Sequence, residues 1–155
     1  MLAYHRKSVC LSIISTDLPI WSVVETAATL YQKDGERFHL LFTEPLTHQH
    51  QPQQPSTRQN PRLLWLEISP YRVTMTLQAN GQLNYRHFWE QGVYGVSRYW
   101  LHSEPLQDQQ IHLHNFTRHL SLTGRLLPQQ LRVEYELWSE KVQLGRYILN
   151  LEIHH

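Results

Sequence analysis

Residues 131–137 read Leu-Arg-Val-Glu-Tyr-Glu-Leu, with an apolar or aromatic residue at every second position and a charged residue between. Residues 147–153 repeat the alternation as Tyr-Ile-Leu-Asn-Leu-Glu-Ile, and residues 71–77 show it as Tyr-Arg-Val-Thr-Met-Thr-Leu. Successive side chains of a β-strand point to opposite faces, so a period of two is typical of strands with one buried and one wet face. The pattern predicts a mainly antiparallel all-β protein.

Similar runs, separated by short turns, extend outward from these stretches along the whole chain. A single closed or nearly closed barrel of about 8–10 strands, calycin-like or lipocalin-like, accounts for their number and spacing, because closure removes exposed sheet edges. The predicted strands are 8–15, 21–31, 36–44, 63–67, 71–78, 82–89, 95–101, 110–114, 118–122, 130–139 and 145–153.

Asp-Gly at 34–35 and Asn-Gly at 80–81 mark two predicted hairpins. Shifting the pairing register of two strands by one residue would turn every side chain of one strand to the wrong face. The loop length must therefore pair the apolar face of one strand with the apolar face of the next. Three-residue loops at 33–35 and 79–81 do so, and they require a positive φ at Gly35 and Gly81. The pairs they predict are Leu30 with Phe38, Ala28 with Leu40, Leu77 with Leu83 and Met75 with Tyr85.

Composition narrows the classes of function. The 155 residues are 41% hydrophobic, and 14 basic residues against 13 acidic ones give a formal charge of +1, so no global field favours nucleic acid or anionic lipid. No stretch approaches the roughly 18 apolar residues of a membrane span, and Asp17 and Pro19 interrupt the run that a signal peptide would need. We expect one cytoplasmic domain over residues 1–155, with no nucleic-acid or membrane partner. Cys10, the single cysteine, is expected to be a buried, inert thiol.

Residues 45–61 break the alternation with four prolines among Gln, His, Thr and Ser. Such a stretch buries too little apolar surface to offset its ordering entropy, so a flexible loop is predicted there.

Several short stretches carry a resemblance to a known family: 26–31 with 34–35, 40–44, 73–77 with Gly81, 86–92, 117–122, 131–137 and 145–153. In their order the chain resembles the YwiB-like family of uncharacterised bacterial proteins, which are small calycin-like β-barrels. The family tends to have Arg-Gly after the middle strand, where this chain reads Gln-Ala-Asn-Gly at 78–81, so no role of that arginine transfers. The 45–61 loop is also longer than its counterpart. Because the family has no established activity, the resemblance implies a barrel and no catalytic residue.

Aromatic residues make up 11% of the chain and fall at inward positions of several predicted strands. Inside a small barrel they either fill the core or line one apolar cavity, and both readings stay open. The leading hypothesis is a non-catalytic module that binds a small apolar ligand or a protein partner. The interior residues predicted to contact a ligand are Phe42, Tyr85, His87, Trp89, Tyr135 and Tyr147.

Histidine supplies the alternative, a metal-dependent or catalytic barrel. His112 and His114 share one face of a predicted strand at a spacing that zinc sites use, although Ile111 and Leu113 look like the inward set. His87 is expected to be a buried, hydrogen-bonded histidine unless it serves a ligand. No cofactor is expected, because the glycines are spread singly and form no phosphate-binding loop. A homodimer through Trp138 and Ile148 is a further hypothesis.

Overall fold

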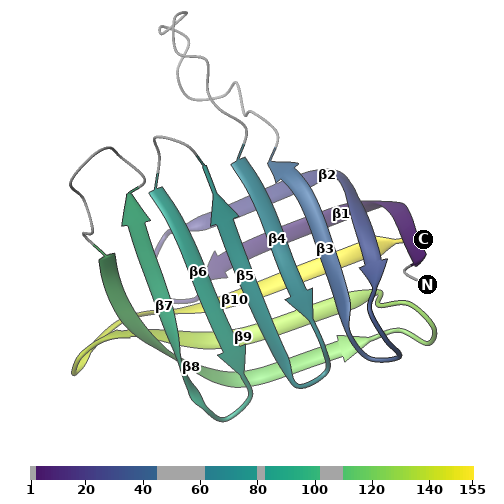
Figure 1. The fold of residues 1–155 in the computed structure, drawn as a ribbon. Helices are drawn as coiled ribbons and strands as arrows, with labels where there is room; N and C mark the ends of the chain where they lie inside the picture. Colours follow the sequence, from purple (N-terminus) through teal and green to yellow (C-terminus); the bar gives the residue numbers. More distant parts are fainter. Residues whose placement is uncertain (1–2, 45–61, 80–82, 102–109) are drawn as a thin grey trace, which may run out of the picture.

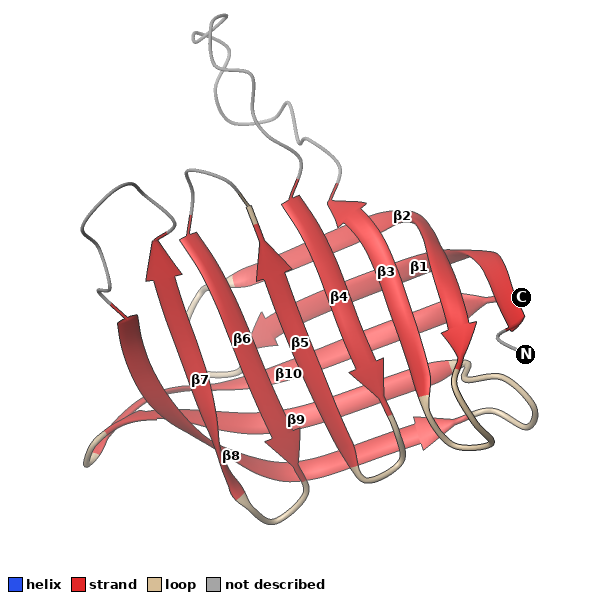
Figure 2. Ribbon diagram, in the orientation of Figure 1, coloured by secondary structure: helices blue, strands red, loops and turns tan. Residues whose placement is uncertain are grey.

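The computed structural model describes residues 3–44, 62–79, 83–101 and 110–155, and every regular element within these ranges is a β-strand (Figure 2). A membrane-spanning helix is absent from these ranges. The strands are β1 (Ala3–Ser15), β2 (Trp21–Gln32), β3 (Phe38–Glu44), β4 (Arg62–Ile68), β5 (Arg72–Gln78), β6 (Leu83–Glu90), β7 (Tyr94–Leu101), β8 (Gln110–Thr123), β9 (Gln130–Ser139) and β10 (Val142–His154).

Each strand pairs antiparallel with the next one along the chain, and β1 pairs with β10 to close the barrel. The shorter strands β3–β7 form one layer that crosses in front of β1, β2 and β8–β10 (Figure 1). The closing pair joins Ser8 to His154, so the first and last strands lie side by side. The predicted all-β closed barrel is confirmed.

Alternation decides which side chains face the barrel interior. In β9, Leu131, Val133 and Tyr135 are buried inside, while Arg132 and Glu134 between them lie on the outer face and bind each other. The same alternation buries Leu149 and Leu151 in β10 and Val73 and Met75 in β5. The three stretches that predict the fold therefore contribute inward faces to one shared core.

The predicted strands 110–114 and 118–122 are one strand, β8, so their separation was wrong. Their alternations are out of phase because the pairing with β9 shifts between Thr117 and His119, leaving Arg118 as an extra residue in a β-bulge. Thr117 before the bulge and Leu120 after it both point inward. A bulge changes the parity of the pattern without ending the strand, which is why the sequence looks interrupted.

The predicted register of both hairpins was wrong by two residues. Leu30 pairs with Leu40 rather than with Phe38, because residues 33–37 form a five-residue turn. The Asp34 carboxylate builds that turn by accepting the backbone N–H groups of Glu36 and Arg37, both at 2.9 Å. Gly35 has no positive φ there, so that prediction was wrong as well.

The second hairpin shows the same displacement: Leu77 pairs with Tyr85, and Met75 with His87. Beyond the last of these pairs, the side-chain Oδ1 of Asn84 accepts the backbone N–H of Ala79. A slip of two keeps every side chain on its predicted face. Gly81 and the predicted flexible loop 45–61 lie outside the described residues.

The two ends of the barrel are filled differently. Near the turns 33–37, 69–71, 91–93 and 124–129, large apolar side chains pack together in the interior. Toward the other end, where β3, β5 and β7 finish, the interior is lined by tyrosines and contains a hollow. The packed residues include Val9, Leu30, Leu40, Leu66, Ile68, Val73, Trp89, Val133 and Leu151.

Candidate functional site: an aromatic cavity inside the barrel

A cavity of about 370 Å³ occupies the tyrosine-lined end of the barrel interior. Every strand except β8 contributes to its wall, because inward positions of neighbouring strands converge there. One side is aliphatic and the other is aromatic, and the Arg62 cation lines the cavity at the start of β4. The wall consists of Leu11, Ile13, Ile20, Ser22, Val24, Phe42, Arg62, Leu64, Met75, Tyr85, His87, Tyr99, Tyr135, Leu137 and Tyr147.

The aromatic side is a continuous chain of touching rings. Tyr85, His87 and Tyr99 meet at the junction of β6 and β7, with the His87 centroid 5.0 Å from Tyr85 and 5.5 Å from Tyr99. Tyr135 continues the chain 6.2 Å from His87 and stacks on Tyr147 at 5.4 Å. Offset and edge-to-face contacts of this kind hold rings in fixed places, so the wall is preformed.

Trp89 closes the cavity from behind. Its ring stacks on His87 at 5.0 Å with an interplanar angle of 6°, and it contacts Tyr135 at 4.9 Å. The indole is fully buried and does not line the hollow. Trp89 thus separates the cavity from the packed end of the barrel.

Gly145 gives Tyr147 its place in the wall. It follows a bulge in β10, where the pairing with β9 shifts between Gln143 and Gly145, and its φ is +152°. A Cβ at this position would lie 2.9–3.0 Å from the Tyr147 ring and hydroxyl. Only glycine combines this backbone conformation with so close an approach of the phenol.

His87 is held from both sides by hydrogen bonds. Its Nδ1 lies 2.7 Å from Ser97 Oγ, which also accepts a hydrogen bond from Asn115 Nδ2 at 2.8 Å. On the cavity side, its Nε2 lies 3.4 Å from the Tyr99 hydroxyl. The expectation of a buried, hydrogen-bonded histidine is confirmed.

Burial keeps the aromatic side of the wall uncharged at neutral pH. It lowers the pKa of His87 to about 3, so the imidazole is neutral. Burial, with a smaller contribution from Tyr147, raises the pKa of Tyr99 to about 12, and burial raises the pKa of Tyr135 still more clearly. The pKa of Tyr147 is raised by burial and by the charge of Asp17. The cavity therefore presents protonated phenols and a neutral imidazole.

The structure places five of the six predicted ligand residues on this cavity: Phe42, Tyr85, His87, Tyr135 and Tyr147. Trp89, the sixth, lies behind His87, because the packed end of the barrel begins at that point of β6. Tyr99 was missed, although it alternates with Ser97 and Gly95 on the inward face of β7. Its inward neighbours are not apolar, so the period-two signal is weak there.

The other predicted residues lie on the outside of the barrel. His112 and His114 are exposed on the outer face of β8, and the described residues hold no group of three His, Cys, Asp or Glu side chains placed to bind a metal. Trp138 and Ile148 also face outward and are half-buried. Cys10 was expected in the core and is instead half-buried on the outer face of β1, because Val9 and Leu11 take the inward positions. Burial and the neighbouring Glu25 and Glu152 raise the pKa of its thiol.

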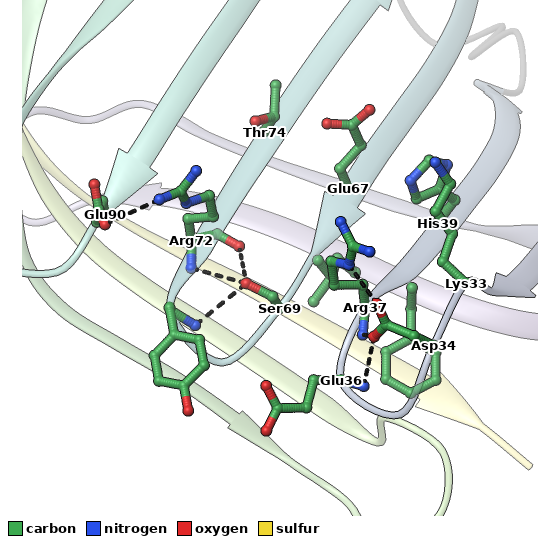
Figure 3. Close-up of a pocket in the computed structure, with 13 residues that line it drawn as sticks. Lys33, Asp34, Glu36, Arg37, His39, Glu67, Ser69, Arg72, Thr74 and Glu90 are labelled. Atoms are coloured by element: carbon green, nitrogen blue, oxygen red, sulfur yellow. Dashed lines mark hydrogen bonds and ion pairs between the residues drawn. The ribbon is translucent and has the colours of Figure 1, made fainter.

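A second hollow, of about 650 Å³, lies on the outer surface between the β2–β3 and β4–β5 turns (Figure 3). Two ion pairs lie along it: Arg37 pairs with Asp34, and Arg72 reaches Glu90 at 3.5 Å. The Ser69 hydroxyl donates to the Arg72 carbonyl, 3.0 Å away. A groove lined largely by exposed charged side chains offers an apolar ligand less than the aromatic wall inside the barrel does, so the barrel cavity is the stronger candidate.

Comparisons with known proteins address the fold. No protein-family model and no curated protein matches the sequence. Among solved structures, the chain is similar to the crystal structure of the YwiB protein from Bacillus subtilis, with a TM-score of 0.63 and 11% sequence identity. The similarity covers 99% of this chain and 94% of that one. At this identity the comparison shows the fold alone: the chain has a YwiB-like barrel.

Proposed function

We propose that this barrel is a non-catalytic binding module that holds a small, largely apolar molecule in the aromatic cavity. The observation that carries the proposal is the preformed wall of touching rings around about 370 Å³ of space, in a barrel whose other end is filled. Small-molecule sites usually measure about 300–1,000 Å³ and are mostly apolar with a few polar groups. The volume is near the lower limit, which favours a small ligand.

The protonation states support binding rather than acid–base catalysis. A general acid or base works best with a pKa near the operating pH, so that it both gives and takes protons. His87, with a pKa of about 3, and Tyr99, with a pKa of about 12, both lie far from neutrality. They fit a site that hydrogen-bonds a ligand without changing charge.

In keeping with its single cysteine, we place the protein in the cytoplasm.

The test compares a substitution on the inner face of β2 with a control substitution on its outer face. Val24 lines the cavity, and its neighbour Val23 lies on the outer face of β2 with 44% of its surface exposed. Val24→Phe should fill the cavity, whereas Val23→Phe adds the same atoms outside. We expect 2-methylnaphthalene to cause saturable NMR shifts at Tyr85 and Tyr135 in the wild type and in Val23→Phe, and none in Val24→Phe. Equal shifts in all three proteins, or no saturable shift in any, would overturn the proposal.

Native mass spectrometry of the protein purified from its own cells gives a second test. We expect a co-purifying mass of a few hundred daltons in the wild type that is lost from Val24→Phe and kept in Val23→Phe. A bound mass that survives Val24→Phe would place the ligand elsewhere on the molecule.

A further inference from the structure

Ser97 lies at the centre of a short hydrogen-bonded chain across β6, β7 and β8, which are neighbours in the barrel (Figure 1). Its side chain points inward and is fully buried. The hydroxyl oxygen is 2.8 Å from Asn115 Nδ2 and 2.7 Å from His87 Nδ1. Within the described ranges, Ser97 Oγ makes no other hydrogen bond.

With the Asn115 amide nitrogen placed on Ser97 Oγ, the contacts give the chain a direction. The Asn115 amide nitrogen only donates, so Ser97 Oγ accepts from it. The Ser97 hydroxyl proton then needs an acceptor, since a buried donor without a partner costs about 1–3 kcal/mol. His87 Nδ1 is that acceptor. A neutral imidazole has one protonated nitrogen, so the proton of His87 is on Nε2.

The Nε2–H group faces the cavity. Its neighbour there, the Tyr99 hydroxyl, is 3.4 Å away, at the long limit for a hydrogen bond, so the contact is weak. His87 itself lines the hollow. A ligand oxygen inside the cavity would find a donor whose orientation Ser97 and Asn115 already hold.

We infer that the cavity selects a ligand bearing a carbonyl-type hydrogen-bond acceptor, which His87 Nε2–H binds, with Ser97 and Asn115 as positioning residues. The inference rests on the proposed function, because it names the chemistry of the molecule that the cavity holds. It adds one oriented hydrogen-bond donor to the aromatic side of the wall.

The tautomer is tested first, in the protein without any ligand. Long-range ¹H–¹⁵N NMR spectra of the histidine side chains at pH 7 distinguish the two neutral forms. We expect His87 in the Nε2–H form in the wild type and in Ser121→Ala, a control on the same β8 strand as Asn115. In Ser97→Ala we expect a mixture of both forms. A wild-type Nδ1–H form would mean that the chain runs from Tyr99 toward Asn115, and the inference would be overturned.

Selectivity is tested with two probes of the same shape, 2-acetylnaphthalene and 2-isopropenylnaphthalene. They differ in one group, C=O against C=CH₂. We expect the wild type to bind the ketone about tenfold more tightly, the value of one hydrogen bond at a dry site. In Ser97→Ala the ratio should fall to about threefold or less. If that variant does not fold, the ratio in the wild type decides alone.

The outcomes separate the two proposals. Equal affinity for both probes would overturn the inference while leaving a binding cavity in place. Binding of neither probe would overturn the proposed function for aromatic molecules of this size, and the inference with it. Tighter binding of the ketone by a protein whose His87 has the Nε2–H form supports both.

Discussion

Gly145 combines a φ of +152° with a Cβ position only 2.9 Å from the Tyr147 hydroxyl. We expect Gly145→Ala to lower the free energy of unfolding by about 2–3 kcal/mol, because it adds backbone strain and pushes a packed ring aside. Urea denaturation measures the loss. The Tyr147 ring resonances should shift in the same variant, since the phenol must move away from the added methyl group.

Two other glycines serve as controls for that experiment. Gly92 has a φ of +75° with nothing within 4 Å of its Cβ position, so Gly92→Ala should cost only the strain, about 1 kcal/mol. Gly35 has neither a positive φ nor a close neighbour, and Gly35→Ala should stay within about 0.5 kcal/mol of the wild type. Equal losses at Gly145 and Gly92 would show that crowding by Tyr147 is irrelevant.

His87 makes stability depend on pH. Its pKa is about 3 in the folded protein against 6.5 for an ordinary histidine, so below pH 6.5 the unfolded chain binds a proton that the folded protein refuses. The contribution of neutral His87 is complete above pH 6.5 and is lost as the pH falls toward 3. We expect the free energy of unfolding to decrease by up to about 1.4 kcal/mol per pH unit in that window.

Comparison with His87→Phe isolates this effect, since the phenylalanine ring keeps the stack on Trp89 and does not titrate. His39, whose pKa is lowered by burial and by Lys33, contributes equally to both proteins. Urea titrations at several pH values between 7 and 4.5 measure the free energy of unfolding of both proteins. This free energy should fall less steeply with decreasing pH in the variant than in the wild type. Parallel slopes would contradict a neutral, buried His87.

At the scale of the element, alternation predicts which face of a strand is buried but not its partner. Leu30 and Leu40 were both predicted inward, yet their pairing was missed, because a register two residues away keeps the same faces together. What decides the register is a side chain in the turn, the Asp34 carboxylate, whose hydrogen bonds to the backbone leave no trace in the hydrophobic pattern.

The candidate site was predictable to the extent that its residues are apolar or aromatic. Five wall residues followed from alternation, whereas Ser97 and Asn115 are inward polar residues in β7 and β8 and look like outward ones in sequence. The bulge at Arg118 hid the continuity of β8 for a similar reason, since one extra residue reverses the parity of the pattern. Whether a polar side chain points inward, or a strand contains a bulge, depends on residues from neighbouring strands. A single sequence does not show which residues these are.

The bulge in β8 has an energetic role that variants can measure. It directs Arg118 to the outer face, where its guanidinium binds the Glu136 carboxylate, which is only 7% exposed. Trp138 Nε1 donates to the same carboxylate at 3.1 Å. We expect Arg118→Leu to cost about 1–3 kcal/mol of unfolding free energy in urea titrations, because a largely buried carboxylate loses its main partner.

Adding Glu136→Gln to the Arg118→Leu variant should restore part of that loss, since the buried charge is then removed. The matched control is Arg132→Leu, which breaks the Arg132–Glu134 pair, where both side chains are exposed, at 41% and 36%. We expect that change to cost less than about 1 kcal/mol. Equal costs for the two arginines would contradict a special role for the bulge.

At the scale of the whole molecule, the barrel is filled at one end and hollow at the other. The filled end supplies the fully buried Leu, Val and Ile side chains that hold the closed sheet together. The hollow end has tyrosines whose rings fix one another and whose hydroxyls keep their protons. Because the packed core and the cavity occupy different layers of the same strands, the barrel can contain a cavity and still keep its hydrophobic core.

Leu64 and Leu66 test that division, because they lie on the same strand, face the same way and are both buried. Both belong to the hydrophobic core, but Leu64 lines the cavity and Leu66 does not. Leu66→Ala should cost about 3–5 kcal/mol, since it opens a void among close-packed neighbours. Leu64→Ala should cost about 2 kcal/mol or less, because part of its surface already faces the hollow and has fewer contacts to lose. Urea denaturation of both variants measures the difference, and equal costs would mean that the hollow end is packed as tightly as the rest.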